Sequence, residues 1–194
     1  MSTVEVDPTP LSIFGASNPV GIVPVDRKWA NKLLATWDNP LGACDRPFGQ
    51  DQWAMQVKGR TVGLAVTAST VSSTLTDETG RVWARKQMAE LARIATADGE
   101  KWATRPLLRF WREVLVHEWE HWPVQLAVSY AIPGKSGGIY RFDGWTRVRK
   151  TKASSGGGTW SKAPKVNAIG DGEKTLWVYR YDPSQNDGGP DGAR

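Results

Sequence analysis

Two histidines four positions apart form the most compact chemical motif of the chain. His117-Glu118-Trp119-Glu120-His121 satisfies the pattern H-E-x-x-H, in which two imidazoles on one helix face hold zinc and the first glutamate acts as a base. The chain has no other histidine, so a third ligand would be a carboxylate from elsewhere, and Pro123 disfavours a helix directly after the motif. A zinc metallopeptidase therefore stays an alternative to the interpretation that both histidines lie at the end of a helix.

Positive charge gathers in the last third of the chain. Between positions 141 and 165, seven basic residues minus one acid, Asp143, give a local charge of +6, whereas the whole chain carries +5. Such a stretch suits nucleic acid or the phosphates of a cofactor, and a solvated basic hairpin is the competing interpretation. The basic residues are Arg141, Arg147, Arg149, Lys150, Lys152, Lys162 and Lys165.

Hydrophobic periodicity predicts the elements that must position these groups. A helix between Asp26 and Asn39 follows from apolar residues at i, i+4, i+5 and i+8, namely Trp29, Leu33, Leu34 and Trp37. A second amphipathic helix begins at Thr104 and ends before Pro123. Alternating or β-branched segments predict strands at 52–57, 61–67, 89–96, 124–130, 146–152 and 175–181, with a turn at 77–80 and a short helical turn at 139–145.

The order of these elements is typical of a mixed α/β layered sheet. A chain of 194 residues, 40% hydrophobic and 23% charged, suits one globular domain. We expect an irregular lead-in over 1–22, the domain over 23–181 and a disordered tail over 182–194. No apolar run reaches membrane-spanning length and no secretory signal is found, which favours a cytoplasmic protein. Cys44 is the only cysteine, which excludes an internal disulfide and a cysteine-based zinc cluster.

Two segments carry a resemblance to a known family. The first is Ala89-Glu90-Leu91-Ala92-Arg93-Ile94-Ala95-Thr96, and the second joins the strand end Ser129-Tyr130 to Gly138-Ile139-Tyr140-Arg141-Phe142-Asp143-Gly144-Trp145. With the order of elements over residues 26 to 181, they resemble the GNAT acyltransferases, most narrowly the branch of the phage Mom proteins, which modify adenine in DNA. The resemblance implies a mostly antiparallel central sheet flanked by helices, and acetyl-CoA or another acyl-CoA as the donor.

The resemblance also implies where the donor binds. The acyl-pantetheine arm would lie between the strands 89–96 and 124–130, and the pyrophosphate would lie on the N–H groups that begin the next helix, where the helix dipole favours anions. Gly99 is the only glycine in the loop before that helix. Helix capping is a competing role for Thr104. The expected cofactor-binding residues are Ile94, Thr96, Lys101, Trp102, Ala103, Thr104 and Arg105.

For the reaction itself, the resemblance implies that Tyr140 protonates the departing CoA sulfur. Ser129 and Tyr130 end their strand facing the same gap, and Glu90 would accept the amine proton directly or through water. Packing of the short helix against the sheet is the competing role for Tyr140. These four residues are the expected catalytic group.

An adenine amine in DNA is the expected acceptor, held by stacking on Trp145 or Trp102. The basic residues Arg141, Arg147, Arg149 and Lys150 would bind its backbone. A non-catalytic GNAT-derived module that binds nucleic acid or a protein is one alternative, beside the zinc metallopeptidase. A small-molecule N-acetyltransferase is another, and its expected mark is an acidic acceptor cleft. No membrane partner is expected.

Overall fold

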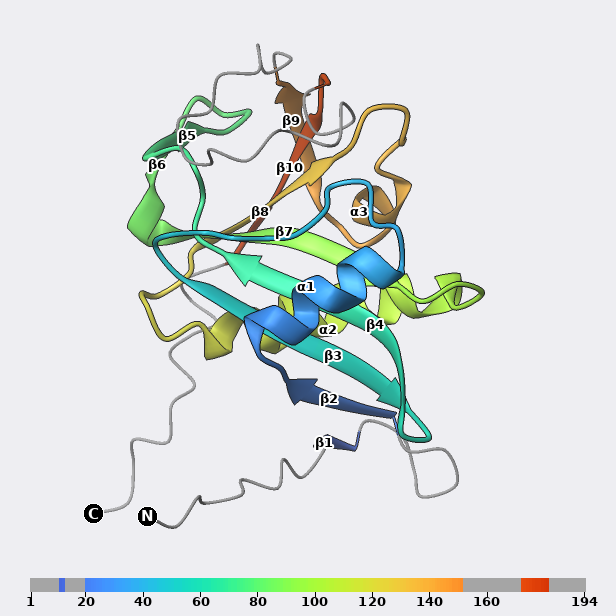
Figure 1. Cartoon of the computed structure of the whole chain (residues 1–194). Helices are drawn as coiled ribbons and strands as arrows, with labels where there is room; N and C mark the ends of the chain where they lie inside the picture. The colour runs from blue at the N-terminus through green and yellow to red at the C-terminus, as the bar shows by residue number, and fades with distance from the viewer. Residues whose placement is uncertain (1–10, 13–19, 152–171, 182–194) are drawn as a thin grey trace, which may run out of the picture.

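One twisted sheet forms the centre of the computed structural model, which describes residues 11–12, 20–151 and 172–181 (Figure 1). Its strands are β1 (Leu11–Ser12), β2 (Val20–Pro24), β3 (Gln50–Val57), β4 (Arg60–Ala68), β7 (Met88–Thr96), β8 (Leu126–Ala131), β9 (Thr146–Lys150) and β10 (Thr175–Arg180). The order in the sheet is β1-β2-β3-β4-β7-β8-β10-β9, and only β7 and β8 pair in parallel. The predicted mixed, mostly antiparallel α/β fold is confirmed.

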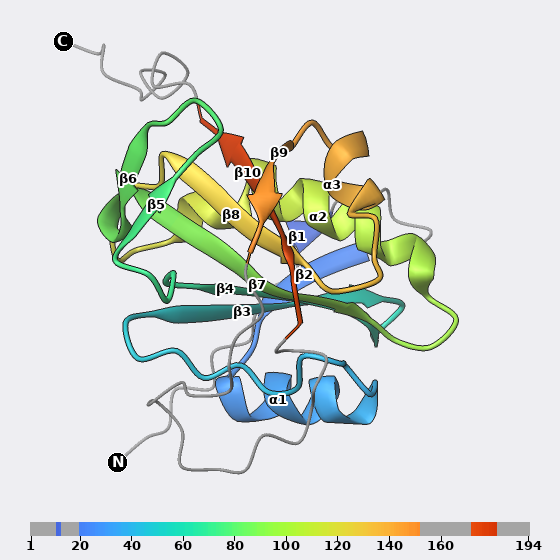
Figure 2. The same ribbon diagram turned by 90° about the horizontal axis from the view of Figure 1, so that it is seen from above.

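The first helix, α1 (Arg27–Thr36), covers one face of the sheet (Figure 2). It begins where the Asp26 carboxylate accepts the Trp29 N–H at 2.8 Å, which satisfies one of the free donors at a helix start. Its buried face carries Ala30 and Leu34, and burial of a side chain such as Leu34 stabilises the fold by about 1.5–3 kcal/mol. The predicted helix, its capping residue and its end before Asn39 are confirmed.

The opposite face carries α2 (Thr104–Glu113) and α3 (Gly138–Phe142). The apolar stripe of α2 packs on the sheet through three fully buried side chains, Leu107, Leu108 and Trp111. The Trp111 indole N–H also donates to the Thr67 hydroxyl at 2.7 Å, so the polar edge of this buried ring has a partner. α2 joins β7 to β8, which is the crossover that a parallel strand pair requires.

The parallel pair β7 and β8 separates part of the way along its length. The last paired residues are Leu91 in β7 and Ser129 in β8. Beyond them β7 stays paired with β4 and β8 stays paired with β10, so each strand follows its outer neighbour. A bulge occurs at this point, because Leu91 and Arg93 pair with consecutive residues of β4 and Ala92 between them has no partner in the register.

The expectation of an irregular lead-in over 1–22 is wrong for residues 11–12 and 20 to 22, which lie in β1 and β2. β2 pairs antiparallel with β3 along its whole length, and its apolar residues Val20, Ile22 and Val23 are buried. Pro and Gly between and beside these residues hid the short strand from a periodicity argument. The expected disordered tail over 182–194 lies outside the described residues.

A small hairpin stands apart from the main sheet. It consists of β5 (Thr74–Thr76) and β6 (Val82–Ala84), which confirms the turn predicted at 77–80. Inside the turn, the carboxylate of Asp77 accepts hydrogen bonds from Thr79, Arg81 and the indole of Trp83. Within the described part of the chain, no helix has the length and apolar character needed to cross a membrane.

Candidate functional site

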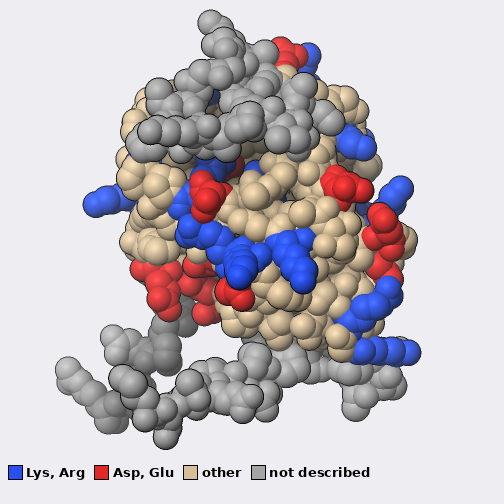
Figure 3. All heavy atoms as spheres, in the orientation of Figure 1, with Lys and Arg blue, Asp and Glu red and all other residues tan. Residues whose placement is uncertain are grey.

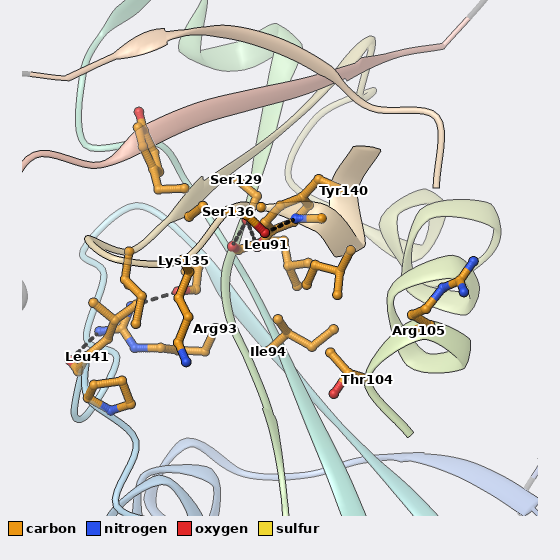
Figure 4. Close-up of a pocket in the computed structure, with 18 of the residues that line it drawn as sticks. Leu41, Leu91, Arg93, Ile94, Thr104, Arg105, Ser129, Lys135, Ser136 and Tyr140 are labelled. Carbon is orange, nitrogen blue, oxygen red and sulfur yellow. Dashed lines mark hydrogen bonds between the residues drawn. The ribbon is translucent and has the colours of Figure 1, made fainter. Parts of the chain in front are cut away.

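A cleft of about 670 Å³ opens where β7 and β8 separate (Figure 4). Leu91 and Ser129, the last paired residues, close its inner end. Its other walls are the start of α2, the loop 132–137, α3, and the loop that follows α1. Separation of two parallel strands thus creates a space that no side chain of the described residues fills.

Tyr140 in α3 forms one wall of the cleft and is 5% exposed. Its hydroxyl lies 2.9 Å from that of Ser129, and Ser129 donates to the Leu91 carbonyl oxygen at 3.0 Å. A serine hydroxyl has one hydrogen, so Tyr140 donates to Ser129 in this arrangement. Burial raises the pKa of Tyr140 against the opposing effect of the Ser129 hydrogen bond, and the Glu90 carboxylate raises it further. Tyr140 is therefore protonated at neutral pH.

Two anchors fix α3 and with it the ring of Tyr140. At the start of the helix, Gly137 has φ +69°, and a Cβ there would lie 2.5 Å from Trp177 Nε1, so glycine is required. At its end, the buried carboxylate of Asp143 accepts a hydrogen bond from Arg112 Nε at 2.9 Å. The Tyr140 ring also stacks on Trp177, with 5.8 Å between ring centroids. The packing role considered for Tyr140 is real and coexists with a hydroxyl at the cleft.

Glu90 and Tyr130 lie on the other face of the sheet from Tyr140. Ser129 and Tyr130 both border the cleft, as expected, but adjacent strand residues point to opposite faces. Glu90 is 5% exposed, and its carboxylate lies 3.0 Å from Arg46 Nη2. Burial raises the pKa of Glu90, and Arg46 is the largest opposing influence. Burial, followed by the Glu90 charge, raises the pKa of Tyr130 to about 12.

Arg93 fixes the loop between α1 and β3 beside the cleft. Its guanidinium donates to the carbonyl oxygens of Leu41, Gly42 and Ala43 at 2.9 to 3.0 Å. This loop contributes Asn39 and Leu41, among others, to the cleft wall. No local pattern in the sequence marks these residues as part of the site, because the contacts join positions at least 50 residues apart.

Three of the expected cofactor-binding residues, Ile94, Thr104 and Arg105, border the cleft. Thr104 does not cap α2, because Ala103 occupies the N-cap position and no side chain caps this end. The expected residues that do not border the cleft are Thr96, Lys101, Trp102 and Ala103, of which Ala103 is fully buried. Lys135 and Ser136 take their place in the wall, on a segment that the sequence predicts only as a loop.

The expected acceptor residues divide between core and surface. Trp145 is 4% exposed and stacks on Trp111, so the prediction that it stacks on a base is wrong. On the face shown in Figure 3, basic side chains lie among acidic ones, so this face is not uniformly positive. Arg141, Arg147, Arg149 and Lys150 are exposed, whereas Lys152, Lys162 and Lys165 lie outside the described residues.

The two histidines do not form the zinc motif. His117 lies in a 3-10 turn, Leu115–Glu118, and Trp119 is extended, so no α-helix places His117 and His121 on one face. His117 packs on Tyr181, with 4.9 Å between ring centroids, whereas His121 packs on Trp119. Across the described ranges, no three His, Cys, Asp or Glu side chains are grouped to hold a metal ion. The metallopeptidase alternative is therefore wrong.

Comparison with known proteins identifies the fold. No protein-family model and no curated protein sequence matches the chain. A Bacillus subtilis acetyltransferase in complex with CoA matches with a TM-score of 0.51 at 8% identity, over 85% of this chain and 99% of that one. A chimaeric and a mutant spermidine N-acetyltransferase from Vibrio cholerae give TM-scores of 0.53 and 0.52, both at 8% identity, over 83% of this chain and 95% and 93% of theirs. The fold is that of GNAT acetyltransferases.

Proposed function

We propose that this chain is an acyl-CoA-dependent N-acyltransferase. The observation that carries the proposal is the Tyr140 hydroxyl, a protonated acid held where two parallel strands separate. A carbonyl group placed between the strands would have Tyr140 towards one face of the sheet and Glu90 towards the other. Acyl transfer to an amine requires an acid and a base in such an arrangement. The CoA complex of an acetyltransferase with the same fold supports this assignment.

The cleft has polar groups for the pantetheine arm and the pyrophosphate of an acyl-CoA, and this cofactor would supply the activated acyl group. Its volume lies within the usual range for ligand sites, about 300–1,000 Å³. The bulge at Ala92 offers backbone polar groups along one side. At the mouth, Arg105 and Lys135 carry positive charge beside the start of α2, where the Thr104 N–H donates to the Lys101 carbonyl oxygen and Pro106 has no N–H. Pyrophosphate would bind to these two cations.

In the proposed reaction, the acceptor nitrogen forms a bond to the acyl carbon while the carbon–sulfur bond of the thioester breaks. Tyr140 gives its proton to the departing sulfur, which leaves as a thiol. Glu90 takes the proton that the acceptor amine loses, directly or through water. One proton is given and one is taken, so the products are an amide and free CoA.

For the acceptor we propose an adenine amine in DNA, which the Mom-like motifs at 89–96 and 129–145 imply. The exposed side chains of Arg141 and Arg147 support this assignment, because cations bind backbone phosphates. With Trp145 in the core, stacking would fall to Trp102, which is 51% exposed. A small-molecule amine is the second candidate, favoured by the burial of Glu90, which a duplex base would reach only after flipping out.

Desulfo-CoA tests the donor site without turnover. A ligand at 100 times its Kd adds about 2.7 kcal/mol to the native state, so the Tm of the wild type should rise by several degrees. Arg105→Gln should reduce the rise, whereas Lys32→Gln, which removes an exposed charge from α1 on the other face, should preserve it. An unchanged Tm would overturn the proposal, and salt-dependent DNA binding would then identify a non-catalytic module.

Mass spectrometry of nucleosides tests the acceptor. After incubation of DNA with the protein and acetyl-CoA, deoxyadenosine should carry one acyl group. If the nucleosides stay unmodified and free CoA is released when a small amine is present, the acceptor is a small molecule and not DNA.

A further inference from the structure

Several cations lie around Glu90, on the face of the sheet opposite the proposed binding site of the CoA pyrophosphate. Four cations lower the pKa of Glu90 or of Tyr130. Glu90 directly precedes Leu91, which borders the cleft, but Glu90 itself does not line the cleft and points to the other face of the sheet. An amine that approaches Glu90 from this face enters a positive field. The four cations are Arg46, Arg93, Arg149 and Lys174.

Arg46 is the cation with donors left for a ligand. The Arg93 guanidinium donates to backbone carbonyl oxygens, and Arg149 Nη1 donates to the Thr76 carbonyl oxygen at 2.5 Å. Arg46 gives Nη2 to Glu90 at 3.0 Å, and its guanidinium also contacts the Cys44 thiol, a weak acceptor. A guanidinium has five N–H donors, and the Arg46 side chain is 20% exposed. An anion can therefore reach it.

Hydrogen bonds hold the loop that carries Arg46. Its own backbone N–H donates to Gln50 Oε1 at 3.0 Å, and Gln50 Nε2 donates to the Cys44 carbonyl at 3.1 Å. Asn31 also binds both sides of Cys44, since it accepts from the N–H at 2.9 Å and donates to the carbonyl at 3.3 Å. Such pre-organisation lowers the cost of binding.

We propose that the acceptor is an amine whose molecule also carries a phosphate or carboxylate group, and that Arg46 binds that anionic group. This inference rests on the proposed N-acyltransferase function. The anion takes donors of Arg46 while the amine lies beside Glu90. A polyamine such as spermidine brings only positive charge towards Arg46, Arg93, Arg149 and Lys174, so this site discriminates against it.

Phosphoethanolamine and ethanolamine are matched probes that differ by one phosphate. In calorimetry with the donor site filled by desulfo-CoA, phosphoethanolamine should bind the wild type more tightly. Arg46→Gln should weaken that binding about tenfold or more, because a charge-assisted bidentate contact is lost. Lys32→Gln, the matched loss of charge on α1, should leave it unchanged.

Two control measurements show whether a loss of affinity comes from misfolding of the variant. The Kd of desulfo-CoA should be the same for wild type and Arg46→Gln, and Arg46→Lys should retain part of the phosphate affinity. β-Alanine and a short oligodeoxyadenylate, used in parallel, distinguish a carboxylate or a phosphodiester from a phosphate monoester. Release of free CoA from acetyl-CoA should be faster with an anionic amine than with spermidine.

The outcomes separate this inference from the acyltransferase proposal. Equal binding by wild type and Arg46→Gln, no binding of any of the three anionic probes, or a preference for spermidine overturns the anionic acceptor. If desulfo-CoA does not bind while phosphoethanolamine binds through Arg46, the anion site stands and the acyltransferase function fails.

Discussion

At the scale of single residues, the direction of one hydrogen bond determines what Tyr140 must do. Its O–H points to Ser129, because the Ser129 hydrogen is used by the Leu91 carbonyl. To protonate a sulfur in the cleft, the phenol hydrogen must turn away from Ser129. Ser129 can then donate to the phenol oxygen in place of Leu91, so the exchange costs one hydrogen bond and restores another.

Tyr140→Phe should therefore lower kcat by about 100-fold or more, since a positioned general acid contributes about 10²–10⁴-fold. The Kd of desulfo-CoA should not change. The raised pKa sets the pH dependence, because the acid form persists above the ordinary tyrosine value of about 10, and kcat should hold up to that pH on the alkaline side. Undiminished turnover by Tyr140→Phe would leave packing as the residue's only role. Ser129→Ala, which keeps the phenol, is the control and should lower kcat less.

Only some of these residues could be located from the sequence. Tyr140 and Ser129 lie in motifs that a local resemblance marks, and both border the cleft. Arg46 and Arg93 act through contacts between segments far apart in the chain, which no spacing reveals. Trp145 had the right type for stacking on a base, but whether a tryptophan is buried depends on the layers packed around it.

At the scale of elements, the helices and most strands follow from periodicity, because each buries one face. The strand β2, which was not predicted, and the end of α2, which was predicted too late, both have local explanations. β2 is five residues long and contains Gly21 and Pro24, so its alternation is too short to detect. α2 ends at Glu113, because Val114 leaves the helical region with φ −128°, and His117 therefore lies beyond the helix rather than on it.

The β5–β6 hairpin depends on one buried carboxylate. Asp77 accepts from Thr79 and Trp83, and it pairs with Arg180 of β10 at 3.0 Å, which ties the hairpin to the main sheet. These hydrogen bonds lower the pKa of Asp77 against the opposing effect of burial. A carboxyl whose pKa is lower in the folded state stabilises that state above its unfolded pKa of about 3.9, and the contribution falls as the pH drops below that value.

Asp77→Asn should reduce the free energy of unfolding at neutral pH by about 3 kcal/mol, the usual cost of breaking a buried ion pair. Urea titrations at a series of pH values would measure the difference from the wild type. The difference should shrink as the pH falls below about 4, because the ionised Asp77 carboxylate of the wild type then stabilises the folded state less. A difference that is independent of pH would show that packing, and not charge, holds the hairpin.

At the scale of the whole molecule, the sheet separates the two halves of the proposed reaction. The N-terminus of α2 and the Tyr140 wall lie on one face, whereas Glu90, which neighbours the inward-facing Leu91, points to the other face and contacts Arg46 there. An acceptor bound by Arg46 would therefore approach the inner end of the cleft from the side opposite the donor. Cys44 is 1% exposed and burial raises its pKa, so the single cysteine of the chain is unsuited to carry the acyl group in between.

This arrangement predicts direct transfer within a ternary complex. Initial rates measured against acetyl-CoA at several acceptor concentrations should give intersecting lines in double-reciprocal plots. A covalent acyl-enzyme would instead give parallel lines, because the donor product would leave before the acceptor binds. Mass spectrometry of the protein incubated with acetyl-CoA alone should show no added acetyl group, and Cys44→Ala should retain turnover. Parallel lines together with a stable acetylated protein would contradict separate approaches from the two faces and move the chemistry to a nucleophile in the cleft.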